Sequence, residues 1–155
     1  MMRLIVWLLQ AIAPLFFVIA TAAFKTKRFR TAKWVMRCYR LAADSGHCGA
    51  LSVYGHLLHL HGNSIASKTQ GAIYLQRAAE QGDMKAQFQM GRIYERGFES
   101  YFQCSTVKAV DNYLLAANQG HILAIKRLQD AYQKGELGLS QDEQLAHQWQ
   151  DKLPY

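Results

Sequence analysis

Three histidines fall close together in the sequence, at positions 56, 59 and 61. Imidazole nitrogens are common zinc ligands. In a helix, residues three apart share a face, so His56 and His59 would lie side by side while His61 points elsewhere. No Cys-x-x-Cys or His-Glu-x-x-His pattern accompanies them. The spacing therefore favours ordinary helical histidines over a metal centre, and we expect no cofactor.

A second pattern that could support chemistry is Ser105-Thr-Val-Lys108. It has the Ser-x-x-Lys spacing of enzymes that act on penicillin, in which the serine is the nucleophile. The sequence contains neither of the partner motifs, Ser-Asp-Asn and Lys-Thr-Gly. Ser105 also stands where a helix cap is expected, and Lys108 is the first residue of a repeated segment. We therefore expect a protein that is not an enzyme.

The segments that carry these residues repeat. The sequence from Trp34 to Gly46 returns at residues 70–82 and 108–120, shifted by 36 and then by 38 positions. Self-similarity at this period is typical of stacked supersecondary units. Each copy ends in Ala-Ala-x-x-Gly, which predicts a helix closed by a left-handed glycine at positions 46, 82 and 120.

A second segment follows each of these glycines. Its apolar positions recur at steps of four, which places them on one helical face: Ala50, Tyr54 and Leu58, then Ala86, Met90 and Tyr94, then Ala124, Leu128 and Tyr132. Gly55 and Gly91 flank the first two stripes and would let a neighbouring helix approach closely. Each repeat is therefore predicted to be a pair of antiparallel helices. The partial copy at residues 145–149 predicts a capping helix.

Serines mark the expected helix starts. Ser67 and Ser105 stand where they could cap the helices of the second and third copies. Ser140-Gln-Asp-Glu143 has the spacing of a capping box, with Ser140 as the cap.

These repeats resemble the SEL-1-like repeat family, relatives of the tetratricopeptide repeats, most clearly at residues 86–97 and 108–120. The resemblance covers roughly residues 31–152. It implies an all-α fold, a right-handed α/α solenoid of about three helical hairpins and a C-terminal capping helix over residues 34–155. It also implies an adaptor that assembles other proteins, as many relatives do in bacterial envelopes. The alternative is an exported periplasmic relative with penicillin-directed hydrolytic activity or metal binding.

The N-terminal segment is apolar. Residues 4–24 carry no charge, which is long enough for a helix to cross a hydrocarbon core. We expect residues 1–24 to form a single transmembrane helix in the inner membrane. The alternative is a secretory signal cleaved near Ala20-Thr-Ala22.

A basic linker follows over residues 25–33. Residues 25–40 hold seven cations and no acid, whereas residues 41–155 hold ten Lys and Arg against eleven Asp and Glu. Basic flanks stay cytoplasmic, so the solenoid is expected in the cytoplasm, with a periplasmic solenoid as the alternative. Four cations are candidate contacts for anionic lipid head groups: Lys25, Lys27, Arg28 and Arg30. Alternatively, these four cations only determine the topology of the chain in the membrane and bind no lipid head group. No motif indicates nucleic-acid binding.

Three cysteines, at positions 38, 48 and 104, cannot all pair within one chain. Cysteine-rich relatives carry paired cysteines that bracket each repeat, and this sequence lacks that arrangement. The composition agrees with a reducing compartment.

The opposite face of the second helices is the candidate partner site, because solenoids present equivalent positions of successive repeats on a concave surface. The predicted binding residues are His56, His59, Lys85, Phe88, Arg92, Arg96, Lys126 and Lys134. Two acids, Glu95 and Asp130, fall on the same strip. The excess of cations predicts an acidic or carboxylate-terminated segment of a partner protein, rather than a small-molecule substrate. The alternative is a solvated face without a partner.

The segment after Gly97 is rich in aromatic residues. Phe98, Tyr101 and Phe102 could anchor a partner, because aromatic side chains often carry much of the binding energy at interfaces. Alternatively, they fold back over the helices beneath them.

Overall fold

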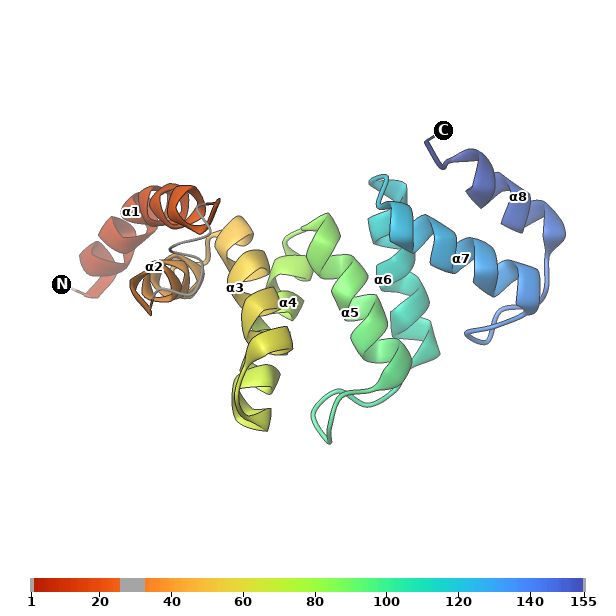
Figure 1. Ribbon diagram of the computed structural model, residues 1–155, viewed down its shortest axis with the longest axis horizontal. Helices are drawn as coiled ribbons and strands as arrows, with labels where there is room; N and C mark the ends of the chain where they lie inside the picture. The colour runs from red at the N-terminus through yellow and green to blue at the C-terminus, as the bar shows by residue number, and fades with distance from the viewer. Residues whose placement is uncertain (1, 26–32, 155) are drawn as a thin grey trace. The chain divides into compact units, whose positions relative to one another are not determined.

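The computed structural model describes residues 2–25 and 33–154, with side chains described for residues 11–24 and 33–154. Within these ranges all eight regular elements are α-helices (Figure 1). The chain divides into two compact units, residues 1–78 and 79–155. The all-α architecture predicted from the repeat period is thus confirmed.

The first unit contains α1 (Met2–Lys25), α2 (Lys33–Asp44), α3 (Cys48–His61) and most of α4 (Ile65–Glu80). α2 packs against both α1 and α3. The core between α1 and α2 is formed by Ala20, Val35 and Tyr39, all at most 1% exposed. Phe17 of α1 lies beside it, with its ring against those of Tyr39 and His47. α1 is therefore packed as one more helix of the stack.

α3 and α4 approach closely through two glycines. A Cβ atom on Gly55 would lie 2.9 Å from the carbonyl oxygen of Gly71 and 2.9 Å from the backbone nitrogen of Leu75. A Cβ atom on Gly71 would collide with the backbone of His59. The prediction that Gly55 marks a close helix contact is confirmed. Gly71 shares in that contact and was not singled out from the sequence.

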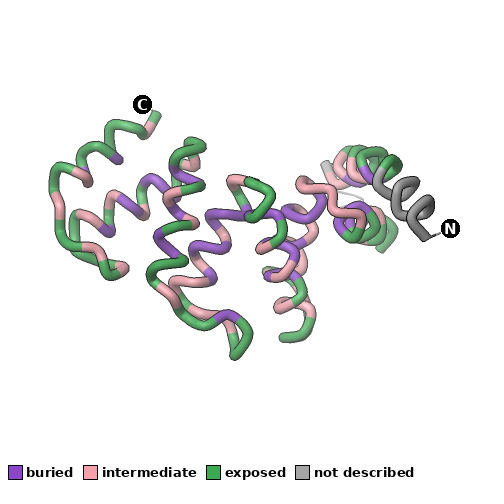
Figure 2. Tube along the Cα trace, turned by 180° about the vertical axis from the view of Figure 1, so that it is seen from behind, coloured by how far each residue is buried: buried purple, intermediate pink, exposed green. Residues whose placement is uncertain are grey.

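The second unit contains α5 (Met84–Arg96), α6 (Thr106–Asn118), α7 (Ile122–Lys134) and α8 (Glu143–Asp151). α6 packs against α5 and α7, and α8 packs against α7. Buried residues recur along each of these helices (Figure 2). Their shared core consists of Phe88, Ala109, Val110, Tyr113, Ala116, Ala117, Ala124, Ile125, Leu128 and Trp149. Small alanines on α6 and α7 let the helices lie close, and larger side chains fill the remaining space.

The repeated glycines close the first helix of each pair. The backbone φ angles of Gly46, Gly82 and Gly120 are 86°, 90° and 89°, so the predicted positive-φ turn is confirmed. One residue later, an N-cap begins the second helix. His47, Asp83 and His121 each accept a hydrogen bond from the backbone N–H of the alanine three residues on, over 3.2, 2.8 and 3.3 Å.

Two of the three predicted serine caps are wrong. Ser105 does cap α6, where its Oγ accepts from the N–H of Lys108 at 3.4 Å. Ser67 lies inside α4, and its own N–H donates to Oγ of Ser64 at 3.1 Å. α8 is capped by Asp142, which accepts from the N–H of Leu145 at 2.9 Å. Asp142 takes the cap position because α8 starts two residues later than the capping-box spacing implied.

In the part of the chain that the structure describes, no helix is both long and apolar enough to cross a membrane. The predicted lipid contacts Lys27, Arg28 and Arg30 lie outside the described residues, as does the side chain of Lys25.

Candidate functional site

A hollow of about 390 Å³ opens between α5, α6 and α7 in the second unit. We refer to it as the basic pocket. Its lining residues are Phe88, Arg92, Glu95 and Arg96 from α5, Tyr113 from α6, and Leu123, Lys126, Arg127 and Asp130 from α7. Their spacing of three and four along α5 and α7 brings them onto one face of each helix.

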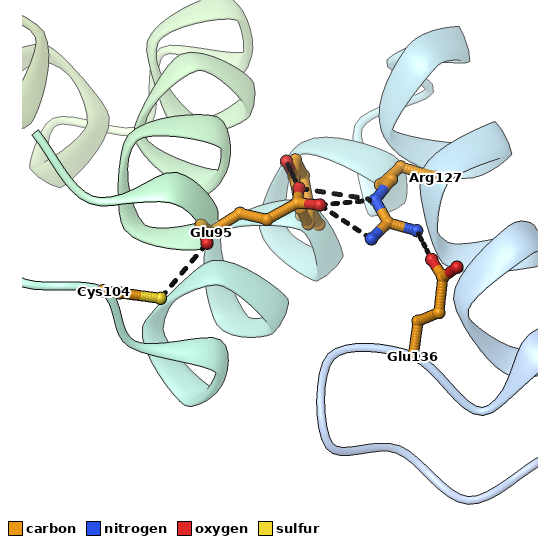
Figure 3. Close-up of polar contacts among 5 residues, drawn as sticks. Glu95, Cys104, Arg127 and Glu136 are labelled. Atoms are coloured by element: carbon orange, nitrogen blue, oxygen red, sulfur yellow. Dashed lines mark hydrogen bonds and ion pairs between the residues drawn. The ribbon is translucent and has the colours of Figure 1, made fainter.

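The floor of the pocket is an ion-pair network (Figure 3). The guanidinium of Arg127 donates to Oε1 of Glu95 over 2.7 Å and to Oε2 of Glu136 over 2.6 Å. Tyr113 donates its phenolic O–H to Oε2 of Glu95 over 2.5 Å. Less than a quarter of the Arg127 and Glu95 side chains is exposed. These contacts fix Glu95 between α6 and α7.

The network shifts the acidities of its members. Burial by itself raises the pKa of Glu95, but the hydrogen bonds from Arg127 and Tyr113, with the charge of Arg127, outweigh it and hold that pKa below its usual value. Burial, followed by the hydrogen bond to Glu95, raises the pKa of Tyr113. The hydrogen bond to Glu95 raises the pKa of Arg127 against the opposing effect of burial. All three groups therefore keep their ordinary charge states near neutral pH.

Three further cations line the pocket. Within the described ranges, none of Arg92, Arg96 and Lys126 forms an ion pair. The pocket lining holds four cations and two acids, and one of those acids, Glu95, is already neutralised by Arg127. The remaining charge is positive, so the pocket can accept an anionic group by charge-assisted hydrogen bonds.

One wall of the pocket is aromatic. Phe88 stacks on His121 with ring centroids 4.4 Å apart and lies 5.8 Å from the ring of Tyr113. Gly91 faces the Tyr113 ring, and a Cβ atom there would come within 2.6 Å of it. Tyr113 is 1% exposed and Phe88 is 8% exposed, so little of either ring is accessible, and the accessible apolar side chain of the pocket is Leu123, which is 56% exposed. An apolar group beside an anion would find contacts of both kinds.

The structure brings together half of the predicted partner-binding residues. Phe88, Arg92, Arg96 and Lys126 all line the basic pocket. Lys85 and Lys134 are exposed on α5 and α7 and do not line it. His56 and His59 belong to the first unit, where Nδ1 of His59 lies 3.1 Å from the carbonyl oxygen of Lys68.

The predicted aromatic anchors have different surroundings. Phe98 and Phe102 pair through two backbone hydrogen bonds of 2.8 and 3.0 Å. The side chain of Phe102 is buried against Tyr94, with ring centroids 5.9 Å apart. Tyr101, next to it, is 63% exposed. Phe102 therefore folds back onto α5, and Tyr101 is the residue left available to a partner.

The chemical motifs of the sequence have structural roles. Ser105 caps α6 with its hydroxyl, and the ammonium of Lys108 lies 5.2 Å from the ring centroid of Tyr94. Among the described residues, no three His, Cys, Asp or Glu side chains gather closely enough to hold a metal ion. Cys38, Cys48 and Cys104 are not joined in disulfides. The thiol of Cys104 donates to the backbone carbonyl of Glu95 over 3.2 Å (Figure 3).

Three lining residues were not predicted: Tyr113, Leu123 and Arg127. Tyr113 occupies the same place in its repeat as Tyr39 and Leu75, which indicated a core position. Arg127 corresponds to Val53 and Gln89, so a charge appears there in only one copy. That single departure from the repeat pattern was the available signal for Arg127.

Comparison with known proteins agrees with the repeat architecture. The family model "Sel1 repeat" matches residues 36–47, 50–83, 85–121 and 123–149. A Sel1 repeat protein from Oxalobacter formigenes has a similar crystal structure, with a TM-score of 0.77 and 26% identity over 90% of this chain and 56% of that one.

A second crystal structure shares the fold. It is c5321, a protective antigen present in uropathogenic Escherichia coli strains and described as having an SLR fold. The TM-score is 0.70 at 24% identity, over 95% of this chain and 30% of that one. The chain thus spans just over half of the first relative and under a third of the second. No curated protein matches the sequence.

Proposed function

Because the chain belongs to the Sel1 repeat family, whose members generally mediate protein–protein interactions, we propose that it is a non-catalytic adaptor that binds a partner through its basic pocket. The partner segment is acidic, either through Asp and Glu side chains or through a free C-terminal carboxylate. The observation that carries the proposal is a set of three cations around one hollow, Arg92, Arg96 and Lys126, which form no ion pair among the described residues.

The electrostatic arrangement supports an anionic ligand. Glu95 would repel an incoming carboxylate if its charge were free, but Arg127 and Tyr113 already bind both of its oxygens. Arg92 and Arg96 are one helical turn apart on α5, so their guanidinium groups can bind neighbouring oxygens. Lys126 contributes a third positive charge from α7.

Leu123, which lines the pocket and is 56% exposed, supports an apolar side chain next to the acid. Aromatic side chains and arginine are enriched where partner proteins bind most tightly. The basic pocket supplies two arginines, Arg92 and Arg96, and Tyr101 on the α5–α6 loop is an exposed aromatic residue.

The experiment is a selection of ligands from a random peptide library, using the full chain as bait. We expect the selected peptides to be enriched in Asp and Glu, or to need a free C-terminus, and to carry an apolar residue beside the acid. Replacing the acids of a selected peptide by their amides, or amidating its C-terminus, should weaken binding at least ~10-fold, because charge-assisted hydrogen bonds are lost. Selected peptides without acid enrichment, whose binding is unchanged by amidation, would refute the proposal.

A further inference from the structure

Arg127 lines the basic pocket and binds two carboxylates that have different positions. Its Nε and Nη2 atoms donate to Oε1 of Glu95, which is itself a lining residue, over 3.1 and 2.7 Å. Its Nη1 atom donates to Oε2 of Glu136 over 2.6 Å (Figure 3). Glu136 comes from the α7–α8 connection and does not line the pocket. One donor of a lining arginine is therefore bound by an acid from outside the pocket.

The two carboxylates are held with different strength. Glu95 accepts from two nitrogens of Arg127 and from the hydroxyl of Tyr113, and 24% of its side chain is exposed. Among the described residues, Glu136 accepts a side-chain hydrogen bond from one nitrogen of Arg127 alone, and 44% of its side chain is exposed. Solvent screens a more exposed ion pair and can take up the released charge. Glu136 is therefore the carboxylate that an incoming anion can displace.

Displacing Glu136 requires no change in the backbone. Its N–H donates to the carbonyl oxygen of Ala131 over 2.9 Å, and its own carbonyl oxygen accepts from the N–H of Leu139 over 3.1 Å. Leu137 and Leu139 also pack against the core of the second unit. The loop can keep these contacts while the Glu136 side chain rotates into solvent. The exchange therefore involves one side chain and leaves the fold of the second unit intact.

The charge of the pocket suits a ligand with two acids. Its lining holds four cations and two acids, which is an excess of two positive charges. A ligand with one carboxylate balances half of this excess. A ligand with two carboxylates balances all of it once Glu136 has left, and it restores the ion pair of Arg127. The Arg127 side chain is 22% exposed, so its ion pair is less screened than one at the protein surface.

We propose that the basic pocket selects a partner segment with two carboxylates, one bound by Arg92 and Arg96 and the other by Nη1 of Arg127, from which it displaces Glu136. The second carboxylate is an Asp or Glu side chain or a free C-terminus. Glu136 is the internal competitor that the ligand replaces, so it sets the affinity for the second acid. This inference rests on the proposed function, because it concerns the ligand of the same pocket.

The first test measures the affinity of a two-acid peptide, selected on the full wild-type chain, by isothermal titration calorimetry. Glu136→Gln removes the competing charge and keeps the bulk of the side chain, so binding should become at least ~3-fold tighter. The matched control is Glu143→Gln, which makes the same change in net charge at an exposed residue of α8 outside the pocket. Its affinity should stay within about 1.5-fold of wild type, because salt screens distant charges. Equal affinities in the two variants would overturn the inference.

The second test locates the acid that competes with Glu136. Each acid of the peptide is replaced in turn by its amide, and both single-acid peptides are titrated into wild-type protein and Glu136→Gln. One of them, which has lost the acid that binds Arg127, should bind both proteins equally. The other should keep the tighter binding to Glu136→Gln. Equal gains for both single-acid peptides would indicate a general charge effect and contradict the exchange.

The outcomes also separate this inference from the proposed function. Selected peptides without acid enrichment would refute both. Acidic peptides that lose affinity for Arg92→Glu with Arg96→Glu, yet bind Glu136→Gln and Glu143→Gln equally, would support the basic pocket as the binding site. They would refute only the displacement of Glu136.

Discussion

At the scale of single residues, Arg127 joins two carboxylates that come from different parts of the second unit. Replacing it by methionine keeps its bulk and removes both ion pairs, so Glu95 keeps a largely buried charge with only the Tyr113 hydroxyl as partner. We expect Arg127→Met to lower the free energy of unfolding by about 1–3 kcal/mol, measured by urea denaturation.

The matched control for that variant is Arg40→Met. Arg40 pairs with Asp44 over 3.5 Å, but both side chains are about half exposed or more, so solvent screens their attraction. This control should cost less than about 0.5 kcal/mol. Equal losses in the two variants would show that the Arg127 network contributes no more to stability than a surface ion pair.

His121 makes the stability of the second unit depend on pH. Burial, and then the charge of Lys85, lower the pKa of His121 below its usual 6.5. The neutral ring also accepts the N-cap hydrogen bond of α7 through Nδ1. The pKa of His121 is lower in the folded state than in the unfolded state. The stabilisation that neutral His121 contributes is therefore complete when the pH is above its unfolded-state pKa. It is lost as the pH falls through its folded-state pKa. The melting temperature should therefore drop as pH falls below about 6.5.

The variant that tests this effect is His121→Asn. Asparagine also caps helices well and does not titrate, so the fall in melting temperature below about pH 6.5 should become smaller. Unchanged pH dependence in His121→Asn would assign the effect to other groups.

At the scale of helices, the glycine contact between α3 and α4 sets how closely they approach. A Cβ atom on Gly55 meets backbone atoms of α4 at 2.9 Å, which cannot move without shifting the helix. Gly55→Ala should thus be destabilising by about 1–3 kcal/mol, although alanine is the better helix former. In the comparison variant Gly49→Ala, the new atom meets side chains alone, the ring of Phe17 at 2.9 Å and that of His47 at 3.4 Å, and the Phe17 ring can turn. Thermal unfolding of both variants should show the larger loss for Gly55→Ala.

The helix α1 shows where sequence patterns are ambiguous at this scale. Its apolar residues point in all directions, which is typical of a membrane span and equally of a helix buried by a neighbour. The contact of Ala20 with Val35 and Tyr39 in the structure is a long-range one. No local pattern in residues 4–24 contains that information.

At the scale of the whole molecule, the repeat period predicted most of the architecture. The shifts of 36 and 38 residues placed the glycine turns, the alanine stripes and the close contact at Gly55 correctly. These features are local and recur from copy to copy, because each repeat packs its pair of helices against the neighbouring repeats in the same way.

Features found in only one copy were predicted less well. Arg127 and Tyr113 meet Glu95 across α5, α6 and α7, and those contacts depend on how three helices pack. The N-caps His47 and His121 were also missed, because histidine is not among the preferred cap residues. The candidate site was therefore found in outline, through Phe88, Arg92, Arg96 and Lys126, without the network beneath it.

The most direct measurement is the affinity of an acidic peptide, selected on wild-type protein, for two variants of equal net charge. Arg92→Glu with Arg96→Glu reverses the pocket cations, and Arg37→Glu with Arg77→Glu reverses two exposed cations of the first unit. We predict that the pocket variant binds at least ~100-fold more weakly, since two charge-assisted contacts are lost, while the control stays within about two-fold of wild type. Equal affinities in the two variants would contradict binding through the basic pocket.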